Sequence, residues 1–216
     1  MMRIGFVGGG KMAGAILSSL LKNGCDPSSL TVSDSSEEAR ARHAAAGVCV
    51  TSDNAEAFLR SDLVFLAVKP QHMTEALAGI GRAADGKTVV TMAAGIRTET
   101  IRSLCPGASC VIRMMPNTPM MVNQGTIAVA FNDAGAEDVK AVTSILSQAG
   151  EVFAVDESLM NAVTALSGSG PAYFYRVAKV LADEAAVLGI PHDMAVRMAA
   201  KTMAGAAEMM LTAGKT

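Results

Sequence analysis

Three glycines near the start of the chain have the types and spacing of a phosphate-binding turn. The turn and the residues after it are Gly8, Gly9, Gly10, Lys11, Met12 and Ala13. Gly8, Gly10 and Ala13 fit the pattern G-x-G-x-x-G/A, in which the first glycine permits a tight turn and the second lets the backbone approach a pyrophosphate. The helix expected after the turn offers free N–H groups and a positive dipole to phosphate. We therefore expect a dinucleotide here; a tight strand-to-helix turn without a ligand is the alternative.

A short polar segment follows the second apolar run, where the adenosine ribose of a dinucleotide would lie. It reads Ser33, Asp34, Ser35 and Ser36, with Arg40 one turn further on. The Asp34 carboxylate could accept from the ribose 2′-OH of NAD and would repel the 2′-phosphate of NADP, whereas the serines and Arg40 could hold that phosphate. The sequence therefore leaves the choice between NAD and NADP open. The alternative role for Asp34 or Ser36 is to cap the next helix.

Three later loops combine small or stiff residues with single polar groups. Residues 67–70 (Ala-Val-Lys-Pro) end one apolar run, and residues 93–95 (Ala-Ala-Gly) end the next, where small side chains would let a flat nicotinamide ring approach. Residues 113–119 contain two prolines, which stiffen the loop, and Asn117, which offers both a donor and an acceptor. Strand ends form the ligand crevice of α/β sheets, so we expect these loops to meet there. For Lys69, a solvated loop lysine is an equal alternative.

The elements that must position these residues alternate between short apolar runs and helix-like stretches. The runs are residues 4–7, 30–33, 63–68, 88–92, 110–114, 126–131 and 151–155, and the helical stretches are 11–23, 37–46, 54–60, 73–83 and 137–148. Short runs rich in Val and Ile suit strands that are buried on both faces. The alternation predicts an α/β fold with a Rossmann-type, doubly wound, mostly parallel sheet.

The pattern changes after residue 156, where we expect no further strand. Helices are predicted at residues 173–188, after the start signals Ser169, Gly170 and Pro171, and at residues 194–213. The sequence thus predicts a dinucleotide-binding domain at 1–157 and a smaller all-α domain for substrate binding and dimerisation at 158–216. Two helices with wide apolar faces cannot bury them alone, so we expect cover from further residues or from a partner subunit, in a homo-oligomer built from dimers.

Composition argues against several classes of function. The formal net charge is −2, the sequence pI is near 5.9 and no basic block occurs, which argues against a nucleic-acid surface. The four cysteines form no CxxC pair, and no histidine lies at metal-ligand spacing from them, so we expect free thiols and no metal site. No apolar run is long enough to span a membrane, and the expected location is cytoplasmic.

Four motifs occur in the order and spacing of the pyrroline-5-carboxylate reductases, and the chain resembles that family along all 216 residues. The motifs are AVKP (67–70), AAG (93–95), RMMPNTP (113–119) and LSGSGPAY (166–173), of which the last is the most specific. The resemblance implies reduction of 1-pyrroline-5-carboxylate to L-proline with NADH or NADPH, the last step of proline biosynthesis. Together with the turn and the second strand end, it places the cofactor at Gly8, Gly9, Gly10, Lys11, Met12, Ser33, Asp34, Asn54, Ala67, Val68, Lys69, Pro70, Ala94 and Gly95.

The substrate side is also inferred from the resemblance. Glu157 matches a position at the family's substrate pocket, although an exposed loop carboxylate is the alternative. We also expect the substrate at Pro116, Asn117, Gly168 and Gly170. Family members continue with an S-P-G-G-T-T-like motif that holds the substrate carboxylate, and the present sequence ends before it. Without that motif we expect cofactor binding to survive and turnover to be weak or absent.

Hydride transfer to a protonated cyclic imine needs positioning more than a strong base. The hydride donor must lie about 3–3.5 Å from the imine carbon. Candidate catalytic residues are Glu157, Ser169 and Thr164, although helix capping or packing is the alternative for the two hydroxyls. A hydroxyacid dehydrogenase would instead need a base, for which Lys179 beside Asp183 is the only lookalike in the corresponding helix. A third hypothesis is a cofactor-binding module without catalysis.

Overall fold

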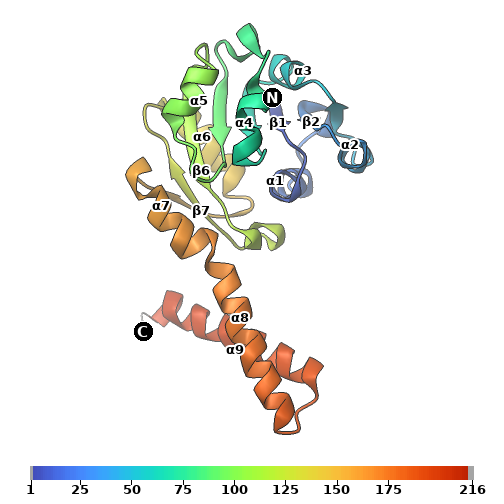
Figure 1. Cartoon of the computed structure of the whole chain (residues 1–216), viewed down its shortest axis with the longest axis vertical. Coiled ribbons are helices and arrows are strands. Elements are labelled where there is room, and N and C mark those ends of the chain that lie inside the picture. Colours follow the sequence, from blue (N-terminus) through green and yellow to red (C-terminus); the bar gives the residue numbers. More distant parts are fainter. Residues whose placement is uncertain (1, 214–216) are drawn as a thin grey trace. The chain divides into compact units, whose positions relative to one another are not determined.

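The computed structural model describes residues 2–213 and divides into two compact units (Figure 1). The first unit is Met1–Gly168 and the second is Ser169–Thr216. The first unit extends beyond the expected boundary near residue 157 because the segment that follows packs back on the sheet. In this segment, buried Met160 lies in one apolar cluster with Met115 and Ala128.

An eight-stranded sheet forms the centre of the first unit, in the order β3-β2-β1-β4-β5-β6-β7-β8. The strands are β1 (Ile4–Val7), β2 (Leu30–Ser33), β3 (Cys49–Thr51), β4 (Leu63–Leu66), β5 (Thr88–Thr91), β6 (Cys110–Met115), β7 (Gly125–Ala130) and β8 (Gly150–Ala154). All neighbouring pairs are parallel except β6 with β7. The predicted doubly wound, mostly parallel α/β fold is therefore confirmed.

Helices and single helical turns connect the strands, and three such turns follow β8. The longer ones are α1 (Lys11–Lys22), α2 (Glu37–Ala44), α3 (Asn54–Leu59), α4 (Met73–Leu77), α5 (Thr98–Leu104) and α6 (Ala136–Leu146). Short turns are η1 (Pro27–Ser29), η2 (Pro70–His72), η3 (Gly81–Ala84), η4 (Thr118–Val122), η5 (Glu157–Leu159), α7 (Met160–Val163) and the π-helical η6 (Thr164–Gly168).

Three details of the chain differ from the sequence prediction. The single helix expected at residues 73–83 is wrong, because Ala78 is extended (ψ 131°) and Gly79 takes a positive φ, which a helix cannot continue. Strand β3 was not predicted, since it has three residues that are all only half-buried. Helix α5 was also missed; Thr98 and Ile101 are its buried residues, too few to give a clear periodicity.

Alternate residues of each central strand enter two separate cores, as expected for strands that are covered on both faces. Phe6 and Phe65 lie in the core under α1 and α6, where their rings stack with centroids 5.1 Å apart. Their neighbours Val7 and Leu66 lie in the other core, under α3, α4 and α5. This two-sided burial fixes the sheet as the rigid support for the loops at its edge.

The carboxyl ends of the central strands lie in register along one edge. Val7 pairs with Ser33 on one side and with Leu66 on the other, and Leu66 pairs with Thr91. The loops after these four residues therefore leave the sheet side by side. The chain reverses its direction of strand addition at β1, and such a switch point is where open α/β sheets bind ligands.

The second unit consists of α8 (Gly170–Val187) and α9 (His192–Ala213), which pack against each other. Gly189, just after the end of α8, has a φ of +99°, which terminates that helix. Ala182 and Ala195 are buried between the helices, while many large apolar side chains are exposed in the single chain. Among the described residues, 2–213, no helix combines the length and apolar character that crossing a membrane requires.

Replacing Phe65 with alanine should destabilise the first unit by about 3–5 kcal/mol, because it removes a fully buried ring and leaves a cavity. The matched control is Phe153→Ala, since the Phe153 ring is 42% exposed on β8 and little burial is lost. Urea unfolding followed by far-ultraviolet circular dichroism measures both. Equal losses in the two variants would contradict this account of the core.

Candidate active site

The turn between β1 and α1 has the backbone that the glycine pattern demands. Gly8 takes a φ of +94°, and a Cβ there would lie 2.9 Å from the Ala67 carbonyl oxygen, so a side chain would be both strained and crowded. Gly10 is the residue before α1 and provides no side-chain cap, and a Cβ on it would meet nothing within 4 Å. The first N–H groups of a long helix are thus left open to an anion in an uncrowded space.

The middle residue of the turn is clamped from both sides. The Gly9 N–H donates to Asp34 Oδ2 at 2.7 Å, while the Gly9 carbonyl accepts from Arg42 Nη2 and from His43 Nε2, each at 2.8 Å. Because a carbonyl only accepts, His43 must carry its proton on Nε2 in this contact. His43 is 6% exposed and approaches so closely that a Cβ on Gly9 would lie 3.0 Å from its ring.

His43 received no role in the sequence analysis, which missed this contact. The available signal was its spacing from Ala39, because residues four apart share one helix face and these two are the buried residues of α2. The sequence does not show which turn this helix face packs against, because that depends on the tertiary structure.

Asp34 is held by backbone groups on both of its carboxylate oxygens. Besides Gly9, the Ser36 N–H donates to Asp34 Oδ1 at 2.8 Å. Ser36 in turn caps α2, so the capping alternative holds for this serine. Arg40 donates to the carbonyls of Asp34 and Ser35 at 2.7 and 3.0 Å, which brings a cation to the carboxylate end of β2. Both an anion and a cation therefore lie at the end of β2.

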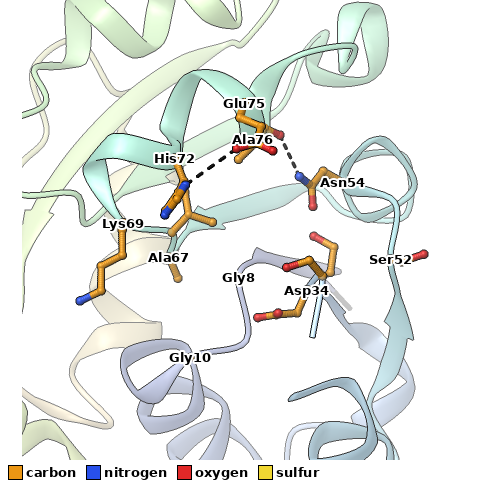
Figure 2. Close-up of a pocket in the computed structure, with 13 residues that line it drawn as sticks. Gly8, Gly10, Asp34, Ser52, Asn54, Ala67, Lys69, His72, Glu75 and Ala76 are labelled. Carbon is orange, nitrogen blue, oxygen red and sulfur yellow. Dashed lines mark hydrogen bonds and ion pairs between the residues drawn. The ribbon is translucent and has the colours of Figure 1, made fainter. Parts of the chain in front are cut away.

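A cavity of ≈ 590 Å³ lies over the glycine turn (Figure 2). Its lining includes eight of the expected cofactor residues, namely Gly8, Gly10, Ser33, Asp34, Asn54, Ala67, Val68 and Lys69. Of the remaining lining residues, Ser35 belongs to the polar segment already considered for the ribose, whereas Ser52, His72, Glu75 and Ala76 were not singled out from the sequence. Figure 2 shows Lys69 on one side of the turn and Asp34 with Asn54 on the other. The volume lies within the range of about 300–1,000 Å³ that is usual for small-molecule sites.

Other expected cofactor residues lie outside this lining. Gly9 lies in the glycine turn, Lys11 and Met12 begin α1, Pro70 begins η2, and Ala94 follows β5. Asn54 donates to the Ala76 carbonyl at 2.9 Å, which ties the start of α3 to the segment after η2.

A second cavity, of ≈ 410 Å³, contains Gly95 together with Glu157. Its other lining residues are Arg97, Arg113, Ser158 and Asn161. Glu157 accepts from the Thr98 N–H at 2.9 Å, from Thr98 Oγ1 at 2.6 Å and from Asn132 Nδ2 at 3.1 Å, and it pairs with Arg113 at 3.3 Å. Burial acts to raise the pKa of Glu157, but these hydrogen bonds outweigh it and hold the pKa below its usual value.

The remaining candidates on the substrate side differ in the hydrogen bonds that their side chains make to backbone groups. Asn117 is buried; its Nδ2 donates to the Ser167 carbonyl at 3.1 Å, and its Oδ1 accepts from the Thr126 N–H at 2.9 Å. Pro116 precedes it in the same loop, and Gly168 is the last residue of η6. Thr164 donates its hydroxyl to the Met160 carbonyl at 2.7 Å. Ser169 precedes α8 without a side-chain capping bond, and Gly170 is the first residue of that helix.

Replacing His43 with phenylalanine should weaken binding of NADPH about tenfold, because a buried donor that fixes the Gly9 carbonyl is lost while a planar ring remains. Titration of the cofactor's own fluorescence measures the dissociation constant. His192→Phe, at an exposed position of α9, is the control and should leave it unchanged. An unchanged dissociation constant in folded His43→Phe protein would contradict the role of the clamp.

Comparison with known proteins agrees with this geometry. Residues 3–95 match the family model described as NADP oxidoreductase coenzyme F420-dependent, and residues 157–216 match pyrroline-5-carboxylate reductase dimerisation. A pyrroline-5-carboxylate reductase of Corynebacterium melassecola is 37% identical to the chain, with 100% of this chain and 82% of that protein covered.

Two solved structures extend the comparison. That of a pyrroline-5-carboxylate reductase from Coxiella burnetii has a TM-score of 0.90 and 33% identity, covering 100% of this chain and 82% of that one. The Plasmodium falciparum pyrroline carboxylate reductase, crystallised with NADP bound, shares the fold with a TM-score of 0.88 at 24% identity, covering 98% of this chain and 79% of that one. Because the matches run along the whole sequence, this chain belongs to the pyrroline-5-carboxylate reductase family.

Proposed function

We propose that the protein reduces 1-pyrroline-5-carboxylate to L-proline by hydride transfer from NADPH or NADH. The observation that carries the proposal is the cavity over the glycine turn in a chain that is 37% identical to a reductase named for this substrate. A dinucleotide fits the residues present, because Gly10 leaves open space beside the uncapped start of α1. When bound, the reduced nicotinamide supplies the hydride.

The chain's own residues hold and orient the cofactor. The start of α1 binds the pyrophosphate through its free N–H groups, and the end of β2, with Ser33 and Asp34, receives the adenosine ribose. Residues 67–70 and the small pair Ala94 and Gly95 line the path toward the nicotinamide. Each of these assignments rests on the strand ends that share one edge of the sheet.

Catalysis in this proposal depends on orientation and on keeping the imine nitrogen protonated. A cationic iminium is already a good electrophile, so no strong base is needed. Pro116, Asn117, Gly168 and Gly170 are proposed to contact the substrate. Of the two hydroxyl candidates for proton supply, Thr164 already donates to a carbonyl, whereas Ser169 makes no capping bond, which favours Ser169.

Glu157 is also assigned to the substrate pocket by the family resemblance. Its carboxylate accepts four hydrogen bonds and its pKa is lowered, so it stays ionised at neutral pH and is poorly suited to deliver a proton. These contacts favour a role in positioning for Glu157.

The rival hydroxyacid dehydrogenase finds little support. It would need an unengaged base, and Lys179 is paired with Asp183 at 2.6 Å on the exposed face of α8. Imine-dependent oxidation of NADPH distinguishes the reductase from a module that binds cofactor without catalysis.

We further propose a homo-oligomer built from dimers through the helical unit. The match of residues 157–216 to a dimerisation family supports it, as do the exposed apolar side chains of α8. Those on α8 with at least half of their surface exposed include Tyr173, Phe174, Tyr175, Val177 and Leu181. Large apolar side chains exposed in this number on one helix favour cover by a partner surface in water. A cytoplasmic location is proposed from the four free cysteines, which suit a reducing compartment.

The full-length protein should oxidise NADPH only when 1-pyrroline-5-carboxylate is present, with formation of proline.

Gly8→Ala should lower kcat/KM about tenfold or more, because a Cβ at φ +94° lies against the Ala67 carbonyl and distorts the turn. The control is Gly135→Ala, since this glycine precedes α6 with a φ of −69°. Saturable NADPH binding without any imine-dependent oxidation would favour the non-catalytic module.

Replacing Leu181 with glutamate should shift the protein toward monomer, because a charge would then be buried in the proposed interface. Analytical ultracentrifugation over a range of concentrations measures the effect. Leu59→Glu is the matched control, since Leu59 is 63% exposed on α3 in the other unit. The same oligomeric state in wild type and Leu181→Glu would contradict this interface.

A further inference from the structure

Four segments that are distant in sequence meet at the carboxylate of Glu157. Thr98 begins α5, Arg113 lies in β6, Asn132 follows β7, and Glu157 begins η5. One oxygen of Glu157 accepts from the Thr98 N–H and from Arg113, and the other accepts from Thr98 Oγ1 and Asn132. We call these four residues the Glu157 cluster.

The charge balance of the cluster depends on the ion pair. Arg113 is 3% exposed, and its Nε and Nη2 atoms have no hydrogen-bond partner among the described residues. Glu157 is its counter-charge across 3.3 Å. A buried cation without its anion is costly, so Arg113 keeps Glu157 ionised and in place. The carboxylate can then only accept hydrogen bonds, which Thr98 and Asn132 supply.

The cluster holds the far end of the turn that carries Gly95. This turn runs from the end of β5 to the start of α5, and Gly95 within it has a φ of +76°. Glu157 binds both the N–H and the hydroxyl of Thr98, so the turn cannot move away without breaking two hydrogen bonds. Gly95, Arg113 and Glu157 also line one cavity, so the fixed turn forms part of the wall that the cluster supports.

We propose that the Glu157 cluster is a positioning device that fixes the Gly95 turn and thereby sets how the nicotinamide ring faces the imine carbon. This inference rests on the proposed function and assigns Thr98, Arg113 and Asn132 to it. It predicts an effect on hydride transfer rather than on cofactor affinity, because the turn at Gly8 and the clamp on Gly9 lie on other strand ends. Small displacements matter, since reacting atoms must approach within about 3–3.5 Å.

The test compares Thr98→Val and Glu157→Gln with wild type in the full-length protein. Thr98→Val keeps the branched shape and the backbone N–H but removes the hydroxyl donor; Glu157→Gln removes the counter-charge of Arg113. Each should lower kcat about tenfold while the KM for NADPH changes by less than about twofold. With NADPH deuterated at the transferred position, the isotope effect on kcat should rise, because hydride transfer becomes more rate-limiting.

Two controls separate positioning from general damage. Thr98→Ser restores a hydroxyl donor and should recover kcat to within about twofold of wild type. Glu151→Gln alters an exposed carboxylate of β8 that makes no ion pair among residues 2–213, and should leave kcat unchanged. Thermal unfolding of each variant is followed in parallel.

Three outcomes would overturn the inference. Wild-type kcat in both Thr98→Val and Glu157→Gln would show that the cluster does not position the turn. A rise in the KM for NADPH equal to the fall in kcat would place the effect on cofactor binding. A wild-type protein that oxidises no NADPH with the imine would overturn the proposed function itself, and this inference with it.

Discussion

The backbone of Gly9 is the point on which the proposed cofactor site depends. Its N–H is bound by Asp34 at the end of β2, and its carbonyl by Arg42 and His43 on α2. A turn of three glycines is flexible by composition, so without these contacts its N–H groups would not be held toward one anion. These contacts therefore hold a flexible glycine turn in one conformation. Binding of the cofactor then does not have to order the turn.

The proposed cofactor site also requires that loops distant in sequence lie at one edge of the sheet. The parallel arrangement of the strands meets this requirement. Parallel strands end on the same side, so β1, β2, β4 and β5 deliver their loops together. Cores on both faces hold these strands rigidly. The loops can thus vary in sequence while their starting points stay fixed, which explains how one sheet carries both the phosphate turn and the turn at Gly95.

Charge placement differs between the two cavities. Beside the glycine turn, Asp34 uses its carboxylate to hold backbone N–H groups, and Arg40 donates to the Asp34 carbonyl. Beside Gly95, Glu157 neutralises the buried Arg113 and holds Thr98. Both carboxylates accept hydrogen bonds from backbone N–H groups and so fix backbone geometry. This agrees with a reaction whose electrophile is already cationic and needs orientation above all.

The sequence alone determined the glycine turn, the doubly wound α/β fold and the helical second part, because these follow from residue type and from local periodicity. It missed the strand β3, the helix α5 and the break after Leu77, where short or half-buried segments give weak local patterns. Only the tertiary structure brought His43 under Gly9, and Thr98 and Arg113 to Glu157. Those contacts join residues 34 to 59 positions apart, and no local spacing encodes which helix face or strand end will meet another.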